Sequence, residues 1–233
     1  MIRPNSGIYL VSTMPAFDEN SVIPLGKLDE NHTAQLYANL ILNHKENFDQ
    51  IVNNASISYF FDEKDKNYLP EDLKKDSPSN IFVDTENSFQ NIKNISDKYF
   101  SSASINLIVF ANSIGFSTSE LKKILDLLTI ESDAVIIGKA INGCVSFIGF
   151  NYLNQELIGE INWDELEFES ILHKVNKFDN FVYVWENSLV VNSKNDFKLL
   201  YSELSKKESL EYCSQQMHEK FTHIFIEYKD LLK

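Results

Sequence analysis

The first candidates for a binding site are small polar residues that lie where predicted strands end. They are Asn112, Ser113, Asn142, Gly143 and Asn192. Ligands of open α/β sheets bind at the carboxyl ends of the strands, so we expect these residues to line one pocket. An asparagine amide both donates and accepts hydrogen bonds, and three of them suit an uncharged, hydroxyl-rich ligand better than a naked phosphate. The expected ligand is sugar-like, with a protein partner as the alternative.

No other group of residues forms a known catalytic motif. The five histidines are His32, His44, His173, His218 and His223. None of them form an i, i+4 pair or a His-Glu-x-x-His motif, so we expect structural or surface roles and no zinc site. The sequence also lacks Gly-x-Ser-x-Gly and P-loop motifs, and its 7 glycines are too few for a glycine-rich dinucleotide loop. Cys144 and Cys213 lack Cys-x-x-Cys spacing, and we expect both to be buried.

Composition predicts a single folded domain in the cytoplasm. The 233 residues are 43% hydrophobic, with 17 Phe and 10 Tyr, which is enough apolar material for one packed core. The 34 acidic residues outnumber 21 basic ones and give a net charge of −13, which disfavours nucleic acid as a partner. The residues before the first predicted strand are polar and resemble neither a signal peptide nor a membrane span. We expect no membrane partner.

Alternating strands and helices predict an α/β fold, a three-layer sandwich with a mostly parallel, Rossmann-like sheet. The predicted strands cover 7–13, 56–61, 81–84, 105–111, 133–139, 144–150 and 181–185, and the predicted helices cover 31–51, 89–99, 117–128, 164–177 and 195–204. Ser117 and Glu120 form a capping box, and Asn142-Gly143 favours a tight hairpin. The charged stretch 62–79 is expected to be a solvated loop.

A long amphipathic helix is predicted at the end of the chain. Its apolar stripe consists of Leu210, Cys213, Met217, Phe221, Ile224, Tyr228 and Leu231. We therefore divide the chain into an α/β domain, 1–209, and a terminal helix, 210–233. The stripe either packs on the domain or, because it follows coiled-coil spacing over three heptads, forms the seam of a homodimer.

Three segments, in order and spacing, carry a resemblance to a known family. They are Ala111-Asn112-Ser113-Ile114-Gly115, then 138–145 followed by Phe147-Ile148-Gly149, and then Val190-Val191-Asn192. Pro15 after the first strand and Trp163 before a helix fit the same pattern. From Gly7 to about Leu204 the sequence resembles the radical-SAM/selenodomain-associated (arsenosugar-type) glycosyltransferase-like family. That family belongs to the GT-A-fold nucleotide-diphospho-sugar transferase superfamily, whose fold the resemblance implies.

The sequence departs from the family at the positions that would hold a metal nucleotide. Asn112, Asn142 and Asn192 stand where the family has acids, and the slot of its basic Lys-Thr-Arg-Leu loop falls on 21–24, Ser-Val-Ile-Pro. Lys27, beside Gly26, is the remaining weak candidate for a phosphate contact. Mg²⁺ and Mn²⁺ prefer anionic oxygen ligands, so these changes predict no metal and no cofactor.

Our leading hypothesis is a diverged, non-catalytic relative of these transferases that binds a sugar or nucleotide sugar. One alternative is an active glycosyl or nucleotidyl transferase that uses Mg²⁺ or Mn²⁺ and recruits other acids. For this role the sequence offers Asp18, Asp29 and Asp196, or the cluster Asp133, Asp164, Glu165 and Glu167. The last group opens a helix, where acids ordinarily complement the dipole. Another alternative is a protein-interaction scaffold that acts through the terminal helix.

Overall fold

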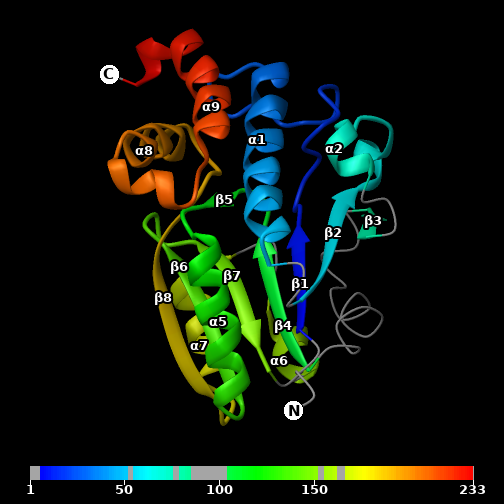
Figure 1. Cartoon of the computed structure of the whole chain (residues 1–233), viewed down its shortest axis with the longest axis vertical. Coiled ribbons are helices and arrows are strands. Elements are labelled where there is room, and N and C mark those ends of the chain that lie inside the picture. Colours follow the sequence, from blue (N-terminus) through cyan, green and yellow to red (C-terminus); the bar gives the residue numbers. More distant parts are fainter. Residues whose placement is uncertain are drawn as a thin grey trace.

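The computed structural model describes residues 6–51, 55–75, 79–84, 104–151, 155–161 and 166–232. Within these ranges the strands form one sheet in the order β3-β2-β1-β4-β7-β6-β8-β5 (Figure 1). Their bounds are β1 Ser6–Val11, β2 Ser56–Asp62, β3 Asn80–Val83, β4 Ile105–Phe110, β5 Ser113–Ile114, β6 Ala134–Ala140, β7 Val145–Phe150 and β8 Phe181–Val190. The neighbours β1–β2, β1–β4, β2–β3 and β6–β8 are parallel. β7 is antiparallel to both β4 and β6, and β5 is antiparallel to β8.

Helices cover both faces of this sheet and give the predicted three-layer α/β fold (Figure 1). Their bounds are α1 Glu30–Asp49, α2 Glu71–Lys74, α5 Thr118–Ile130, α6 Gln155–Glu160, α7 Phe168–Val175, α8 Lys194–Leu204 and α9 Gln215–Glu227. Short 3₁₀ helices lie at η1 Glu63–Asn67, η5 Lys207–Glu211 and η6 Lys229–Leu231. None of the described helices is both long and apolar enough to cross a membrane.

Two hydrophobic cores lie on opposite faces of the sheet because successive strand residues point to opposite sides. In β1, Ile8 and Leu10 join the core beneath α1, α5, α8 and α9, whereas Tyr9 and Val11 join the core beneath α6 and α7. β1 and β4 are buried along their whole length, as parallel strands covered on both faces should be. The two apolar segments that the sequence predicted as strands, β1 and β4, thus lie in the interior of the sheet.

Two local sequence signals are confirmed in the structure. Ser117 and Glu120 form the capping box that opens α5, with each side chain bonded to the other residue's backbone. Asn142 and Gly143 form the turn between β6 and β7, where Gly143 has a φ of +82° that favours glycine. Both features are specified by residues close together in the sequence, so they could be predicted without knowledge of tertiary contacts.

The expectation of a solvated loop at 62–79 was wrong for the described residues 62–75. This stretch contains η1 and α2, and Asp65 within it is fully buried. The expectation that both cysteines are buried was wrong for Cys144, which is partly exposed, although Cys213 is 1% exposed. The predicted helix 89–99 and Trp163 lie outside the described residues.

The single long terminal helix was also wrong. The chain forms η5, breaks at 212–214, and starts α9 only at Gln215, because the Ser214 side chain accepts a hydrogen bond from the Met217 amide and caps the new helix. The apolar side of α9 is buried in the core that α1 also covers, through Met217, Phe221, Ile224 and Phe225. This apolar stripe is thus largely covered by the chain's own fold.

His44 of α1 is a buried ionisable group in that core. Its ring is 2% exposed, lies against Phe48 and Phe116, and has Nε2 at 3.3 Å from Ser113 Oγ. Burial lowers the pKa of His44 to about 4. The imidazole is therefore neutral in the folded protein at neutral pH.

We expect His44 to make the fold sensitive to mild acid. In the folded protein the pKa of His44 lies below the ordinary 6.5, so the neutral imidazole contributes fully to the free energy of unfolding above pH ~6.5. That contribution, about 3 kcal/mol, is lost as the pH falls to about 4. Urea unfolding from pH 7 to 4 should show a smaller loss for His44→Gln than for the wild type. His223→Gln, at an exposed site on α9, is the control and should follow the wild type. Parallel stability curves for all three proteins would contradict this role.

Candidate functional site

A cavity of about 570 Å³ opens where β1, β4 and β8 end. These strands run in the same direction, so their carboxyl ends meet at one edge of the sheet, the usual ligand position in such folds. The described residues that line the cavity are Thr13, Met14, Ile23, Pro24, Leu25, Tyr37, Asn112, Cys144, Leu166, Glu167, Val190 and Asn192. Two of the five predicted site residues, Asn112 and Asn192, are among them.

Asn112 and Asn192 form a pair across this cavity wall. The Asn112 side-chain amide donates a hydrogen bond to the Asn192 side-chain oxygen. The backbone supports the pair, because Val191 N–H donates to the Asn112 carbonyl at 2.8 Å. The ends of β4 and β8 thus hold two neutral amides together, each with further hydrogen-bonding capacity.

Asn142 lies behind this wall and outside the lining. Its Nδ2 donates to the Val190 carbonyl at 2.7 Å and to Asp196 Oδ1 at 2.8 Å. Asp196, in the first turn of α8, is 7% exposed and accepts through Oδ2 from the Asn192 amide and the Ser193 hydroxyl. The Asp196 carboxylate therefore joins the β6–β7 turn, the end of β8 and the start of α8 through three accepted hydrogen bonds.

The other predicted positions do not line the cavity. Ser113 is fully buried and donates to the Phe110 carbonyl at 2.6 Å, so its hydroxyl is used within the core. Gly143 lies on the β6–β7 turn, where its carbonyl accepts a hydrogen bond from the Phe168 amide. Lys27 is exposed, and the neighbouring Gly26 packs closely on Lys194 rather than at the cavity.

The acids considered as alternatives are also placed elsewhere or used by the backbone. Asp18 accepts hydrogen bonds from Asn20 and Ser21, which lower its pKa. Asp29 caps α1 by accepting from the His32 amide. Asp133 precedes β6, and of the described members of its proposed cluster, Glu167 lines the cavity and Asp133 does not. Asp164 and Glu165 lie outside the described residues.

The charged side chains that act on Cys144 and Tyr37 in the cavity lining are acidic. The pKa of Cys144, which lies half-buried in the lining, is raised by burial and then by the charges of Asp196 and Glu167. The pKa of Tyr37 is raised to about 12, mainly by burial and further by Asp196. No Lys, Arg or His is among the described lining residues. The walls that the structure describes thus repel a phosphate group instead of neutralising it.

A buried carboxylate holds the loop that forms another cavity wall. Asp65 Oδ1 accepts from the backbone amides of Ala16, Phe17 and Asp18, and Oδ2 accepts from Ala16, at 2.8 to 3.1 Å. Burial raises the pKa of Asp65, and these three amides oppose that shift. The amides after β1 are therefore bound to a carboxyl group of the chain itself. Sequence reasoning missed Asp65 because its partners lie 47 to 49 residues away.

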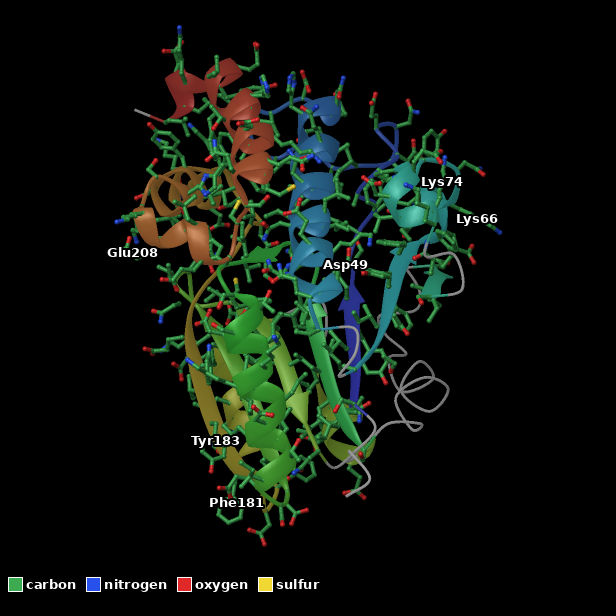
Figure 2. The ribbon with its side chains drawn as sticks, in the orientation of Figure 1. Asp49, Lys66, Lys74, Phe181, Tyr183 and Glu208 are labelled. Atoms are coloured by element: carbon green, nitrogen blue, oxygen red, sulfur yellow. The ribbon has the colours of Figure 1, made fainter. Side chains whose placement is uncertain are left out.

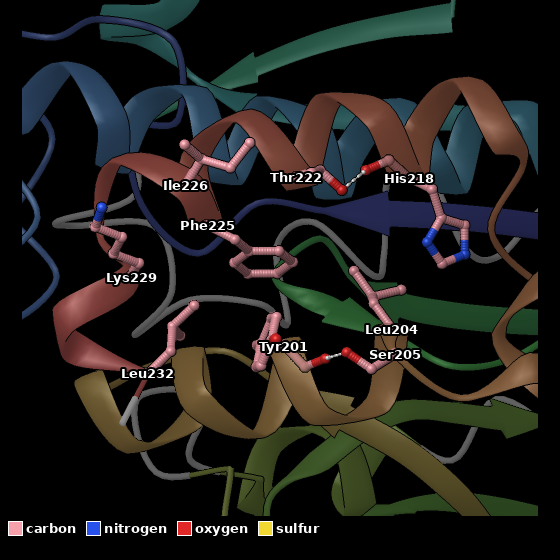
Figure 3. Close-up of a pocket in the computed structure, with 9 residues that line it drawn as sticks. All are labelled: Tyr201, Leu204, Ser205, His218, Thr222, Phe225, Ile226, Lys229 and Leu232. Carbon is pink, nitrogen blue, oxygen red and sulfur yellow. Dashed lines mark hydrogen bonds between the residues drawn. The ribbon is translucent and has the colours of Figure 1, made fainter.

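A second cavity, of about 440 Å³, lies between α8 and α9 (Figure 3). Most of its lining is apolar, including Leu204 and Phe225. Two of its hydroxyls bond to their own helices: Ser205 donates to the Tyr201 carbonyl and Thr222 donates to the His218 carbonyl (Figure 3). Because this cavity lies away from the strand ends, we place the candidate site in the first cavity.

Solved structures share this architecture. A protein from Desulfovibrio desulfuricans G20 described as a candidate nucleotide-diphospho-sugar transferase has a TM-score of 0.66 and 16% identity, with 96% of this chain and 97% of that chain covered. Rv0371c from Mycobacterium tuberculosis H37Rv has a TM-score of 0.53 and 8% identity, with 87% and 99% covered. A cytidylyltransferase from Leptospira borgpetersenii has a TM-score of 0.50 and 12% identity, with 100% and 97% covered. The chain has a nucleotide-diphospho-sugar transferase-like fold.

At these identities the likeness concerns the transferase-like fold alone. Sequence comparison adds nothing to it, since no family model matches the chain and no curated protein matches it. Within the described ranges, no group of three or more His, Cys, Asp and Glu residues is placed to hold a metal ion. The chemistry of the cavity must therefore be argued from its own residues.

We expect Asp65→Ala to destabilise the protein by about 3 kcal/mol, because it leaves three buried amide donors without their acceptor. Glu63→Ala, at an exposed acid in the same 3₁₀ helix, is the matched control and should change the free energy of unfolding by less than about 0.5 kcal/mol. Urea unfolding measures both values. Equal, small effects would mean that the Asp65 contacts do not hold the loop.

Proposed function

We propose that the chain is a diverged relative of the nucleotide-diphospho-sugar transferases that binds a neutral, hydroxyl-rich ligand and does not carry out metal-dependent transfer. Within that superfamily, the order of the sequence motifs favours the radical-SAM/selenodomain-associated family. The observation that carries the proposal is the Asn112–Asn192 amide pair in a cavity whose described lining has no cation.

The first argument is electrostatic. Transfer from a nucleoside diphosphate needs positive charge, from a metal or from basic side chains, to stabilise the leaving phosphates. Here the charged group of the described lining is Glu167, and the nearby Asp196 already accepts hydrogen bonds from Asn142, Asn192 and Ser193. These bonds leave Asp196 about one free lone pair for a metal. An uncharged ligand requires no metal.

The second argument is the match between the lining and a sugar. Amide groups donate and accept, as hydroxyl groups do, so the Asn112–Asn192 pair can exchange its single mutual bond for bonds to a ligand. Ile23, Pro24, Leu25 and Tyr37 add an apolar wall. A mostly apolar surface with a few placed polar groups is typical of small-molecule sites.

Thermal unfolding with a panel of neutral saccharides, nucleoside diphosphates and nucleotide sugars tests the proposal. We expect a neutral saccharide to raise the Tm equally with Mn²⁺ or EDTA, and a ligand at 100 times its Kd stabilises by roughly 2.7 kcal/mol. Asn112→Leu should weaken binding about tenfold through lost hydrogen bonds. Asn31→Leu, at an exposed position in α1, is the matched control and should bind as the wild type does.

An active glycosyl or nucleotidyl transferase is the second candidate. Asp196 and Glu167 both act on the Cys144 thiol at the cavity, and one structural neighbour, Rv0371c, was solved in complex with manganese. A Tm increase that requires both a nucleotide and Mn²⁺, and that disappears in Asp196→Asn, would favour this candidate and overturn the first. An interaction scaffold remains the third hypothesis, based on the terminal helix.

A further inference from the structure

β8 is a sheet edge with an apolar sequence. Its first half pairs with β6 through Phe181–Trp185, and in the described part of the chain this half has no other strand partner. β8 runs along the margin of the molecule in Figure 1, and Phe181 and Tyr183 lie at that margin in Figure 2. Phe181 is 61% exposed and Val184 is 44% exposed. An exposed strand edge of this kind is a template for another strand.

The backbone geometry identifies which groups face outward. The Phe181 amide donates to the Asp133 carbonyl at 3.0 Å, on the side of β6. Backbone polar groups alternate in direction along a strand, so Val182 and Val184 present their N–H and C=O groups to the open side. The outward N–H and C=O groups of Val182 and Val184 can therefore form hydrogen bonds with the backbone of an added strand.

The edge lacks the features by which proteins block strand pairing. Native edges are protected by Lys, Pro, a bulge or a very short strand. The segment 181–185, Phe-Val-Tyr-Val-Trp, contains no proline and no charge, and β8 is 10 residues long. The left-handed Asn187, with φ of 84°, comes only after this segment. The edge is therefore open for five consecutive residues.

We propose that a second copy of this chain pairs antiparallel with Phe181–Trp185, with the two-fold axis at Tyr183. In this register Val182 faces Val184 of the partner subunit, Phe181 faces the partner's Trp185, and the two Tyr183 residues face each other. The outward N–H and C=O groups of Val182 and Val184 then form hydrogen bonds between the two strands. The aromatic side chains of Phe181, Tyr183 and Trp185 lie on one face of the extended sheet, and the two valines lie on the other.

The flanking residues select this register. Asn180 lies opposite Glu186 of the partner subunit, and Asp179 lies opposite the partner's Asn187, so no like charges meet although each chain carries −13. A shift by two residues in one direction would place Val184 opposite Asn180. A shift in the other direction would place Val182 opposite Glu186. The register centred on Tyr183 is the one that pairs all five apolar residues with one another.

Light scattering after size exclusion tests the dimer. The wild type should have twice the mass of one chain, and Val184→Lys should have the mass of one chain because a charge then enters the paired edge. Ile130→Lys, at a 76% exposed apolar position in α5, is the matched control and should remain dimeric. Circular dichroism verifies that each variant is folded. A monomeric wild type, or a folded Val184→Lys dimer, would overturn the proposal.

A cysteine scan tests the register in a Cys144→Ser background, where the remaining Cys213 is 1% exposed. On oxidation, Tyr183→Cys should form a covalent dimer, since facing residues of a non-hydrogen-bonded pair have Cα atoms about 4.5 Å apart. Val182→Cys alone should not crosslink, because it faces Val184. Preferential crosslinking of Val182→Cys, or equal crosslinking of both variants, would overturn this register.

Discussion

The Asp196 carboxylate holds the corner of the molecule on which the cavity depends. It joins the β6–β7 turn through Asn142, the end of β8 through the Asn192 amide, and the start of α8 through Ser193. A carboxylate that is 7% exposed requires such donors, because an unpaired buried charge is costly. The position of the Asn112–Asn192 pair follows from this arrangement.

Asp65 likewise fixes a cavity wall, the loop after β1, by accepting hydrogen bonds from its backbone. There, three consecutive backbone amides donate to one buried carboxyl group, so the loop is fixed by an acceptor from the chain itself. Free amides in such a loop would provide a site for an external anion. Asp65 fixes the loop after β1, and Asp196 fixes the wall that carries the neutral Asn112–Asn192 pair. The charged residue of the described lining is the acidic Glu167. Its described surface therefore complements hydroxyl groups better than phosphates.

The sequence predicted the features that depend on neighbouring residues. The apolar runs of β1 and β4, the Ser117–Glu120 capping box and the Asn142-Gly143 turn are specified within a few residues. The strand-end argument also selected Asn112 and Asn192. It could not separate them from Asn142, whose amide is turned away by Val190 and Asp196. It missed Asp65 for the same reason, since its partners are distant in sequence.

β8 contributes to two separate surfaces, the open sheet edge at 181–185 and the cavity wall at its carboxyl end. Its first half is partly exposed and parallel to β6, whereas Leu189 and Val190 are buried, pair with β5 and lead to Asn192. The register with β6 shifts between Gly138 and Ala140, and Asn187 adopts a positive φ between the two halves. This irregularity lets the strand change partners without a break. Because it separates the open edge from the cavity wall, pairing of two copies at 181–185 would stabilise β8 and leave the Asn112–Asn192 geometry unchanged.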